Sequence, residues 1–348
     1  MQQREGTMPP LILSGDTISV RLESKHLEVI RWAEKGVREE ARIKVPMIDI
    51  DRVVLIGRPN VTIAVLQRLM LDGIPSYFLT TRGRWIGSLV PDNNKNAFRR
   101  IRQFQLWGDK EFALEIARKL VRAKIKNSRR ALQRLSANRQ ATSHYLQQQV
   151  DADLKDLADK AESTETVESL RGYEGMAAAT YFSRLGCFFP EDVPFKERNR
   201  RPPKDPANAL MSWTYTVLLG EVEGAVRAHG LDPCIGFLHD VSYGTPSLAL
   251  DLMEPLRAPV CDLLVLNMLN HNILKKEDFR FDSEHSAYYL KEESHRTFFT
   301  SYENSMTRRF SMEKGGAHTD FRKVINDSVI AVLHAMEGQQ DFDFFIMP

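Results

Sequence analysis

Residues 74–104 read IPSYFLTTRGRWIGSLVPDNNKNAFRRIRQF, and the secondary-structure signal changes in the middle of this stretch. Before Pro91, aromatic and β-branched residues on either side of Arg82 and Gly83 predict a hairpin of two strands. The polar, turn-forming residues from Pro91 to Asn94 break that pattern. After them, apolar residues recur at helical spacing among basic ones. We therefore predict a domain boundary at residue 94.

Strand signals fill the chain before this boundary. Residues 11–23 predict a hairpin that turns at Gly15 and Asp16, and residues 44–57 have the β-branched content of one or two strands. Residues 61–73 have the apolar spacing of a helix that ends at a glycine. The first part of the chain is therefore predicted to be rich in β-structure.

Long helix-forming runs fill the chain after the boundary. Apolar residues between positions 96 and 135 recur at helical spacing among basic ones, which predicts one or two amphipathic basic helices. The prolines of residues 189–206 predict a loop, because each internal proline removes a backbone donor. Residues 248–271 predict one or two buried helices with a junction at Pro255 and Pro259.

These patterns define an α+β chain. We expect a β-rich N-terminal domain over residues 1–94 and a larger all-α C-terminal domain over residues 95–348. A length of 348 residues fits roughly two domains of ~150 residues each. A composition of 43% hydrophobic and 27% charged residues excludes a disordered or collagen-like chain. Because no stretch reaches ~18 uninterrupted apolar residues and residues 1–15 lack a basic leader with an apolar core, we expect no membrane segment and a cytoplasmic protein.

The overall charge conceals a segregated pattern. The chain has 48 Lys and Arg against 46 Asp and Glu, a net charge of +2. Residues 95–140 nevertheless carry 14 basic and 3 acidic side chains, whereas residues 141–348 carry 21 basic and 32 acidic ones. Clustered lysine and arginine gain affinity for phosphates through counterion release, which favours a surface for a polyanion. A solvated helix face explains the basic cluster equally well.

Two segments place a single metal-ligand side chain in apolar surroundings. Glu174 lies between glycines in RGYEGMAAATYF, and a buried carboxylate there needs a cation or a basic partner. The dipole of a helix N-terminus would favour the same acid without any ligand. His239 ends the apolar run CIGFLH, and a neutral imidazole is a common transition-metal ligand. A hydrogen-bonded core or loop histidine is the alternative interpretation.

A third segment, LDLMEPLR, places charged side chains on one helical face. Asp251, Glu254 and Arg257 follow one another at intervals of three residues. One interpretation is a Glu–Arg pair within the helix, worth only a few tenths of a kcal/mol. The other is a carboxylate ligand supported by a basic contact to phosphate.

Taken together, these segments resemble CRISPR-associated protein one, the integrase of CRISPR adaptation. The resemblance is carried by GYEG at 172–175 with YF at 181–182, by FKERNRRPPKDPANALMSWTY at 195–215, and by GFLH at 236–239 followed by SLALDLMEPLR at 247–257. The basic stretch VRAKIKNSRRALQRL at 121–135 is similar to that family as well. The motifs occur in the order and at the spacing of the family.

The resemblance implies a helical catalytic domain and a homodimer formed largely through the β-rich N-terminal domains. It implies that Glu174, His239 and Glu254 bind one divalent metal, with Asp251 as a second acidic position close by, so that the main third ligand stays open. Two carboxylates and one imidazole suit Mn²⁺ or Mg²⁺ and leave coordination positions free. Such an ion activates water for nicking, or the 3′-hydroxyl of a new spacer for integration into the repeat array.

The resemblance and the charge pattern also suggest DNA contacts. Arg257 matches a basic position that resembles the family's DNA contacts, and the family has a similar lysine and asparagine pattern near the active site. The proline-rich loop supplies further basic residues for phosphates, which could instead brace the active-site helices. The expected DNA contacts are Arg257, Lys124, Lys126, Asn127, Arg198, Arg200, Arg201 and Lys204.

Three functions from different classes remain open. The first is the metal-dependent endonuclease and integrase of CRISPR adaptation, which acts with CRISPR-associated protein two on double-stranded DNA with 3′ ends and on the CRISPR repeat. The second is a non-enzymatic DNA-binding structural subunit, against which the intact metal-ligand set argues. The third is a general repair nuclease for branched DNA, which the same phosphoryl-transfer chemistry would serve. The C-terminal residues 337–348, EGQQDFDFFIMP, are predicted to pack either on this chain or on a partner.

Overall fold

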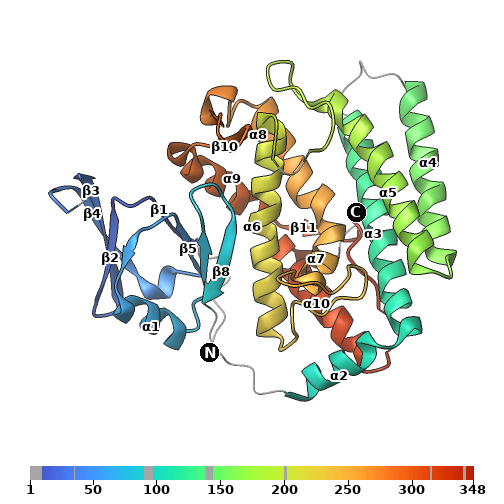
Figure 1. The fold of residues 1–348 in the computed structure, drawn as a ribbon, viewed down its shortest axis with the longest axis horizontal. Coiled ribbons are helices and arrows are strands. Elements are labelled where there is room, and N and C mark those ends of the chain that lie inside the picture. The colour runs from blue at the N-terminus through green and yellow to red at the C-terminus, as the bar shows by residue number, and fades with distance from the viewer. Residues whose placement is uncertain are drawn as a thin grey trace.

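A strand-rich part comes first in the chain and a helical part follows it, in the α+β arrangement expected from the sequence (Figure 1). The computed structural model describes residues 10–34, 36–89, 97–137, 144–199, 202–313, 316–339 and 342–348. The predicted boundary at residue 94 lies outside these residues, between the last strand of the first part and the first helix of the second. Among the helices of the described ranges, none is long and apolar enough to cross a membrane.

The strand-rich part consists of two sheets and one helix. The first sheet has the order β1 (Leu11–Ser14), β5 (Val53–Ile56), β7 (Ser76–Leu79) and β8 (Trp85–Leu89). The second has the order β4 (Arg38–Pro46), β3 (His26–Glu34), β2 (Ile18–Glu23) and β6 (Asn60–Val61). Helix α1 (Ile63–Leu71) ends before Gly73, as predicted. Apolar residues from both sheets and α1 share one core, which includes Leu13, Val20, Leu55 and Leu69.

The hairpin predicted over residues 11–23 is wrong. Strand β1 pairs in parallel with β5, and β2 pairs antiparallel with β3 in the other sheet. Gly15 continues the first ladder by donating its N–H to the carbonyl of Ile56, and its positive φ of 92° turns the chain toward the second sheet. A local turn signal is the same for a hairpin and for a crossing between sheets, so the pattern alone could not separate them. The β7–β8 hairpin around Arg82 and Gly83 is confirmed.

The helical part is built from long helices around the buried helix α3. Its helices are α2 (Ala97–Trp107), α3 (Lys110–Ala137), α4 (His144–Ser163), α5 (Val167–Leu185), α6 (Pro206–Ala228), α7 (Ser247–Met253), α8 (Leu263–Asn270), α9 (His295–Thr307) and α10 (Phe321–Met336). This part is not entirely helical, because β9 (Phe279–Asp282) pairs with β10 (Ala287–Leu290) and β11 (Phe310–Ser311) with β12 (His318–Thr319). The proline-rich residues before α6 form the predicted loop, and Asp205 caps the helix.

The junction predicted at Pro255 and Pro259 interrupts the helical run between α7 and α8. A 3₁₀ turn covers Glu254–Leu256, and a π-helical segment covers Arg257–Asp262. A proline inside a helix removes one backbone donor and crowds the preceding turn, and π segments are frequent at functional sites. The interruption therefore makes the side chains of Glu254 and Arg257 project in other directions than they would from a continuous α-helix.

Helix α6 joins the two parts by packing against β8 (Figure 1). A Cβ on Gly220 of α6 would lie 2.3 Å from the ring of Trp85, so this close approach requires glycine. A buried ion pair crosses the same junction, and in it Arg52 Nη1 lies 2.5 Å from Glu221 Oε1. The helical part thus contacts the first sheet through both close packing and an ion pair.

Candidate metal-binding site

Glu174 and Glu254 converge on one ammonium group. The Nζ atom of Lys124, on α3, lies 2.5 Å from Oε1 of Glu174 on α5 and 2.6 Å from Oε2 of Glu254. The side chain of Glu254 is 2% exposed, whereas those of Lys124 and Glu174 are 16% and 19% exposed. Two carboxylates that are distant in the sequence therefore share one cation at the edge of the helical core.

Glu254 is held as a carboxylate although it is buried. Burial alone would raise its pKa, but the charges of Arg257 and Lys124 outweigh burial and lower the pKa of Glu254 to about 2. The Nη2 atom of Arg257, which is one helical turn further along the chain, lies 3.0 Å from Glu254 Oε1. The Glu–Arg pair expected from LDLMEPLR is thus present, and the carboxylate keeps its second oxygen for Lys124.

His239 is oriented by Asp251. Asp251 Oδ1 lies 2.7 Å from His239 Nδ1, and the carboxylate also accepts the backbone N–H groups of Phe237, Leu238 and His239. With Nδ1 engaged, Nε2 faces the carboxylates at 3.9 Å from Glu254 Oε1. Burial opposes protonation of the ring, but the hydrogen bond and charge of Asp251, with Glu254 and Glu174, raise the pKa of His239 above its usual value.

The hydrogen bonds of Asp251 separate its role from that of Glu254. Its side chain is fully buried, and both oxygens already accept hydrogen bonds from the 237–239 backbone and the imidazole. Gly236 makes this packing possible, since a Cβ there would lie 2.6 Å from Asp251 Oδ2. Asp251 thus orients the imidazole, whereas the carboxylate of Glu254 contacts the side chains of Lys124 and Arg257.

A further buried acid, Asp262, which was not predicted from the sequence, binds the tyrosine whose ring Arg257 contacts. The hydroxyls of Tyr181 and Tyr215 donate to the buried carboxylate of Asp262 at 2.8 and 2.5 Å. The guanidinium of Arg257 lies over the ring of Tyr215, 5.0 Å from its centroid. Burial raises the pKa of Asp262 to about 6 against these hydrogen bonds. A single acid in the apolar run PVCDLLVL was the available signal, because such an acid needs buried partners.

The donor set fits a divalent metal. Two carboxylates and the Nε2 atom of a histidine fixed through Nδ1 are ligands that Mn²⁺ and Mg²⁺ accept, and a carboxylate behind the imidazole is the usual support of a metal-bound histidine. Lys124 demonstrates that the two carboxylates can share one cation. Its ammonium must move for an ion to bind between Glu174 and Glu254.

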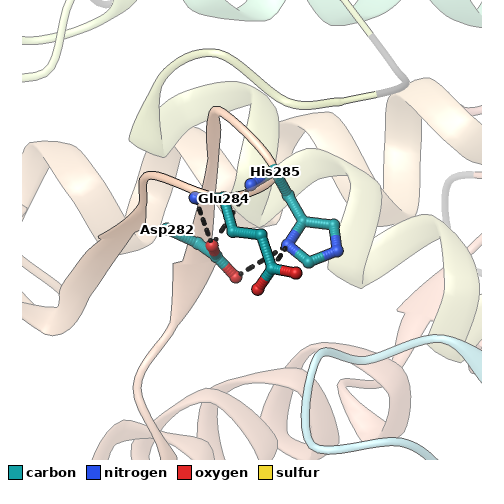
Figure 2. A group of neighbouring side chains, drawn as sticks. All are labelled: Asp282, Glu284 and His285. Carbon is teal, nitrogen blue, oxygen red and sulfur yellow. Dashed lines mark hydrogen bonds and ion pairs between the residues drawn. The ribbon is translucent and has the colours of Figure 1, made fainter.

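A different cluster brings three possible ligand atoms within 4.8 Å of one another in the described residues. Figure 2 shows this group, Asp282, Glu284 and His285, at the turn between β9 and β10. Asp282 Oδ1 accepts hydrogen bonds from the backbone N–H groups of Glu284 and His285. Asp282 Oδ2 lies 3.2 Å from His285 Nδ1 and 3.2 Å from Arg82 Nη2. These contacts close the turn and tie it to the β7–β8 hairpin, so they account for the cluster without a ligand.

The structure gives several expected DNA contacts other partners. Asn127 is fully buried and cannot reach DNA in this structure, which corrects that expectation. Arg198 braces the proline-rich loop by donating to Asn208 and Ser212 of α6, which was the alternative reading for these arginines. Lys204 is exposed and Lys126 is half-buried. Arg200 and Arg201 lie outside the described residues.

Some basic side chains of the segment 95–140 pair with acids of this chain. Arg129 forms a bidentate pair with Asp151 of α4 at 2.9 and 2.6 Å, and Arg122 pairs with Glu162 and Asp343. Between Ile116 and Leu132, α3 buries its apolar face, and Arg122 and Arg129 lie half-buried beside that face, where acidic partners offset their loss of water. These arginines have acidic partners within the chain, and a contact of this helix with DNA stays a prediction.

The C-terminal residues pack on this chain. Phe342, Phe344, Phe345 and Met347 are buried, and the segment runs along α3. The sequence left open whether these residues contact this chain or a partner. Their apolar side chains complete the core of the helical part, which decides for this chain.

The fold and the site together define an α+β chain whose helical part carries a carboxylate and imidazole site. The family model for CRISPR associated protein Cas1 matches residues 11–304. CRISPR-associated endonuclease Cas1 3 of Thermus thermophilus is 35% identical over 286 residues, which cover 82% of each protein. The chain belongs to the Cas1 family, as the sequence motifs indicated.

Two solved structures have the same fold. A casposase bound to its integration product superposes with a TM-score of 0.85 at 24% identity, over 98% of this chain and 94% of the casposase. A Cas6-RT-Cas1–Cas2 complex contains a chain that superposes with a TM-score of 0.79 at 27% identity, over 100% of this chain and 37% of that one. The arrangement of strand-rich and helical parts is therefore that of solved Cas1 structures.

Proposed function

We propose that this chain is a metal-dependent DNA endonuclease and integrase of CRISPR adaptation, with Glu174, His239 and Glu254 as the ligands of one Mn²⁺ or Mg²⁺ ion. The observation that carries the proposal is the convergence of both carboxylates on the ammonium of Lys124, beside an imidazole fixed by Asp251. Membership of a family whose curated relatives are named endonucleases agrees with it.

In this proposal the residues of the chain orient the metal ligands, hold them in the ionised form and pair with the phosphate. Asp251 holds the imidazole so that Nε2 points toward the carboxylates, and Arg257 holds Glu254 in its ionised form. When Lys124 leaves the carboxylates, its ammonium is free to pair with an incoming phosphate. Glu174, His239 and Glu254 would hold a divalent ion, which would supply Lewis-acid activation of the attacking hydroxyl and charge neutralisation at the phosphate. Attack by a 3′-hydroxyl joins DNA strands, and attack by water cuts one.

The proposed partners follow from the charges and from the structural relatives. Lys204 and the lysines near the site are the proposed contacts to double-stranded DNA, in addition to Arg257. The solved complex with Cas1 and Cas2 supports CRISPR-associated protein two as a partner. We further propose a homodimer formed through the strand-rich part, acting in the cytoplasm.

The test is Mn²⁺-dependent strand transfer of a duplex with 3′-hydroxyl ends into supercoiled repeat DNA. Glu174→Gln and His239→Ala should lower the rate at least 100-fold and leave the metal-free affinity for DNA within about threefold. Glu168→Gln, an exposed acid on the same helix, is the matched control. Full activity of either site variant would overturn the ligand assignment. Cutting of branched duplexes without joining would instead favour the repair nuclease.

A further inference from the structure

The carbonyl of Pro255 directly follows Glu254 and lacks its ordinary helical partner. In an α-helix this carbonyl would accept the N–H of residue 259, but residue 259 is a proline and has none. A buried carbonyl without a donor costs free energy comparable to a lost hydrogen bond. The segment that follows is π-helical rather than α-helical, so this carbonyl lies outside the regular α-helical pattern and is open to a side-chain donor.

The side chain of Asn127 supplies the missing donor. Its Nδ2 atom donates to the Pro255 carbonyl at 2.7 Å from α3, one turn beyond Lys124. The same nitrogen donates to the carbonyl of Phe345 at 2.8 Å, and Oδ1 accepts the N–H of Met347 at 2.7 Å. Both ends of the amide are thus fixed by the C-terminal segment, in one orientation only.

The C-terminal segment is itself firmly attached along α3. Phe344 and Met347 are 3% and 2% exposed. Lys119 donates to the carbonyl of Phe342 at 2.5 Å and Arg134 to that of Pro348 at 2.6 Å, with Asn127 between these two contacts. The segment therefore holds the amide of Asn127 in place at both of its polar ends.

We propose that residues 342–348 help to position a ligand of the site. Met347 and Phe345 fix Asn127, and Asn127 positions Glu254 through the Pro255 carbonyl. The proposal rests on the proposed function, since it assumes that Glu254 binds the metal. Asn127 is a positioning residue here, and the chain's last residues belong to the site although they touch none of its carboxylates.

The test is calorimetric titration of the full-length protein with Mn²⁺, at a temperature well below the unfolding midpoint of each variant. Asn127→Ala should weaken Mn²⁺ binding 10- to 100-fold, the usual range for loss of a group that supports a ligand. Met347→Pro removes the N–H that Met347 donates to Asn127 Oδ1, replaces the thioether side chain with a ring that restricts φ, and should weaken Mn²⁺ binding several-fold. Met347→Leu keeps that N–H and should bind Mn²⁺ within about twofold of wild type. DNA affinity in EDTA should change less than twofold throughout.

The outcomes separate this proposal from the proposed function. If Asn127→Ala and Met347→Pro fold and bind Mn²⁺ like wild type while Glu254→Gln binds it weakly, the segment is merely structural and the proposal fails. If Glu254→Gln itself binds Mn²⁺ normally, the ligand assignment fails. Should Asn127→Ala not fold, the comparison of Met347→Pro with Met347→Leu decides, because these two variants differ in the N–H that Asn127 accepts.

Discussion

Asp251 Oδ1 lies 2.7 Å from His239 Nδ1, and the same carboxylate accepts the backbone N–H of His239 itself at 2.9 Å. The pair fixes both the main chain and the ring of the histidine. One buried acid thus holds both the backbone and the ring of His239, and Nε2 is the ring nitrogen that faces Glu254.

Asp251→Asn should weaken Mn²⁺ binding 10- to 100-fold without abolishing folding. An asparagine offers one acceptor oxygen to donors that now share two, so at least one buried N–H loses its partner, at about 1–3 kcal/mol. Asp240→Asn is the matched control, since Asp240 is the next residue after His239 and its side chain is 81% exposed. Equal Mn²⁺ affinities for the two variants in a calorimetric titration would contradict the role of Asp251.

Lys124→Met should destabilise the protein chiefly when no metal is present. The variant leaves Glu174 and buried Glu254 without their shared cation, but Arg257 still pairs with Glu254, so we expect about 1–3 kcal/mol rather than the 3–5 of an orphaned charge. Urea unfolding in EDTA and in Mn²⁺ measures this, and Mn²⁺ should restore more stability in the variant than in wild type. Lys126→Met is the control, and an equal loss there would refute the prediction.

Substitutions of Arg198 and Lys204 should distinguish a role in bracing the proline-rich loop from a role in DNA binding. Arg198→Gln should lower the free energy of unfolding by about 1–3 kcal/mol, because Arg198 donates to Asn208 and Ser212. Lys204→Gln should leave stability unchanged and reduce the slope of log affinity against log salt by about 1, as expected for one lost phosphate contact. Salt titrations of duplex binding and urea unfolding of both variants test this. The opposite assignment of the two effects would disprove it.

His295 should make the fold sensitive to acid. Its ring stacks on Trp213 and contacts the hydroxyl of Ser14 at 3.0 Å, and burial lowers the pKa of His295 to about 4 from an ordinary 6.5. The folded state therefore prefers the neutral ring. This contribution to stability is complete above pH 6.5 and is lost as the pH falls through 4.

His295→Gln tests that pH dependence. The variant should be less stable than wild type at pH 7, and this difference should shrink as the pH falls from 6.5 to 4. Thermal or urea unfolding over that pH range measures the difference. Exposed His318→Gln provides the comparison. A constant difference between wild type and His295→Gln at every pH would rule out His295 as the titrating group.

Local pattern was sufficient for several of the elements. The change from strand to helix across Pro91–Asn94, the β7–β8 turn at Gly83 and the interruption at Pro255 and Pro259 each follow from the geometry of a few neighbouring residues. The pairing of β1 was not accessible in this way. Its partner β5 lies far along the chain, and a turn at Gly15 fits either a hairpin or a crossing between sheets.

The sequence by itself determined the α+β order of elements, the family and the residue types of the candidate ligand set, because periodicity, proline positions and short motifs are written in consecutive residues. The tertiary structure decided which of those residues meet. It placed Lys124 between Glu174 and Glu254, made Asp251 a support, and paired the basic helix α3 with acids and with the C-terminal segment. The physical reason is burial, since a buried charge or amide must find its partner wherever packing brings one, at any distance along the chain.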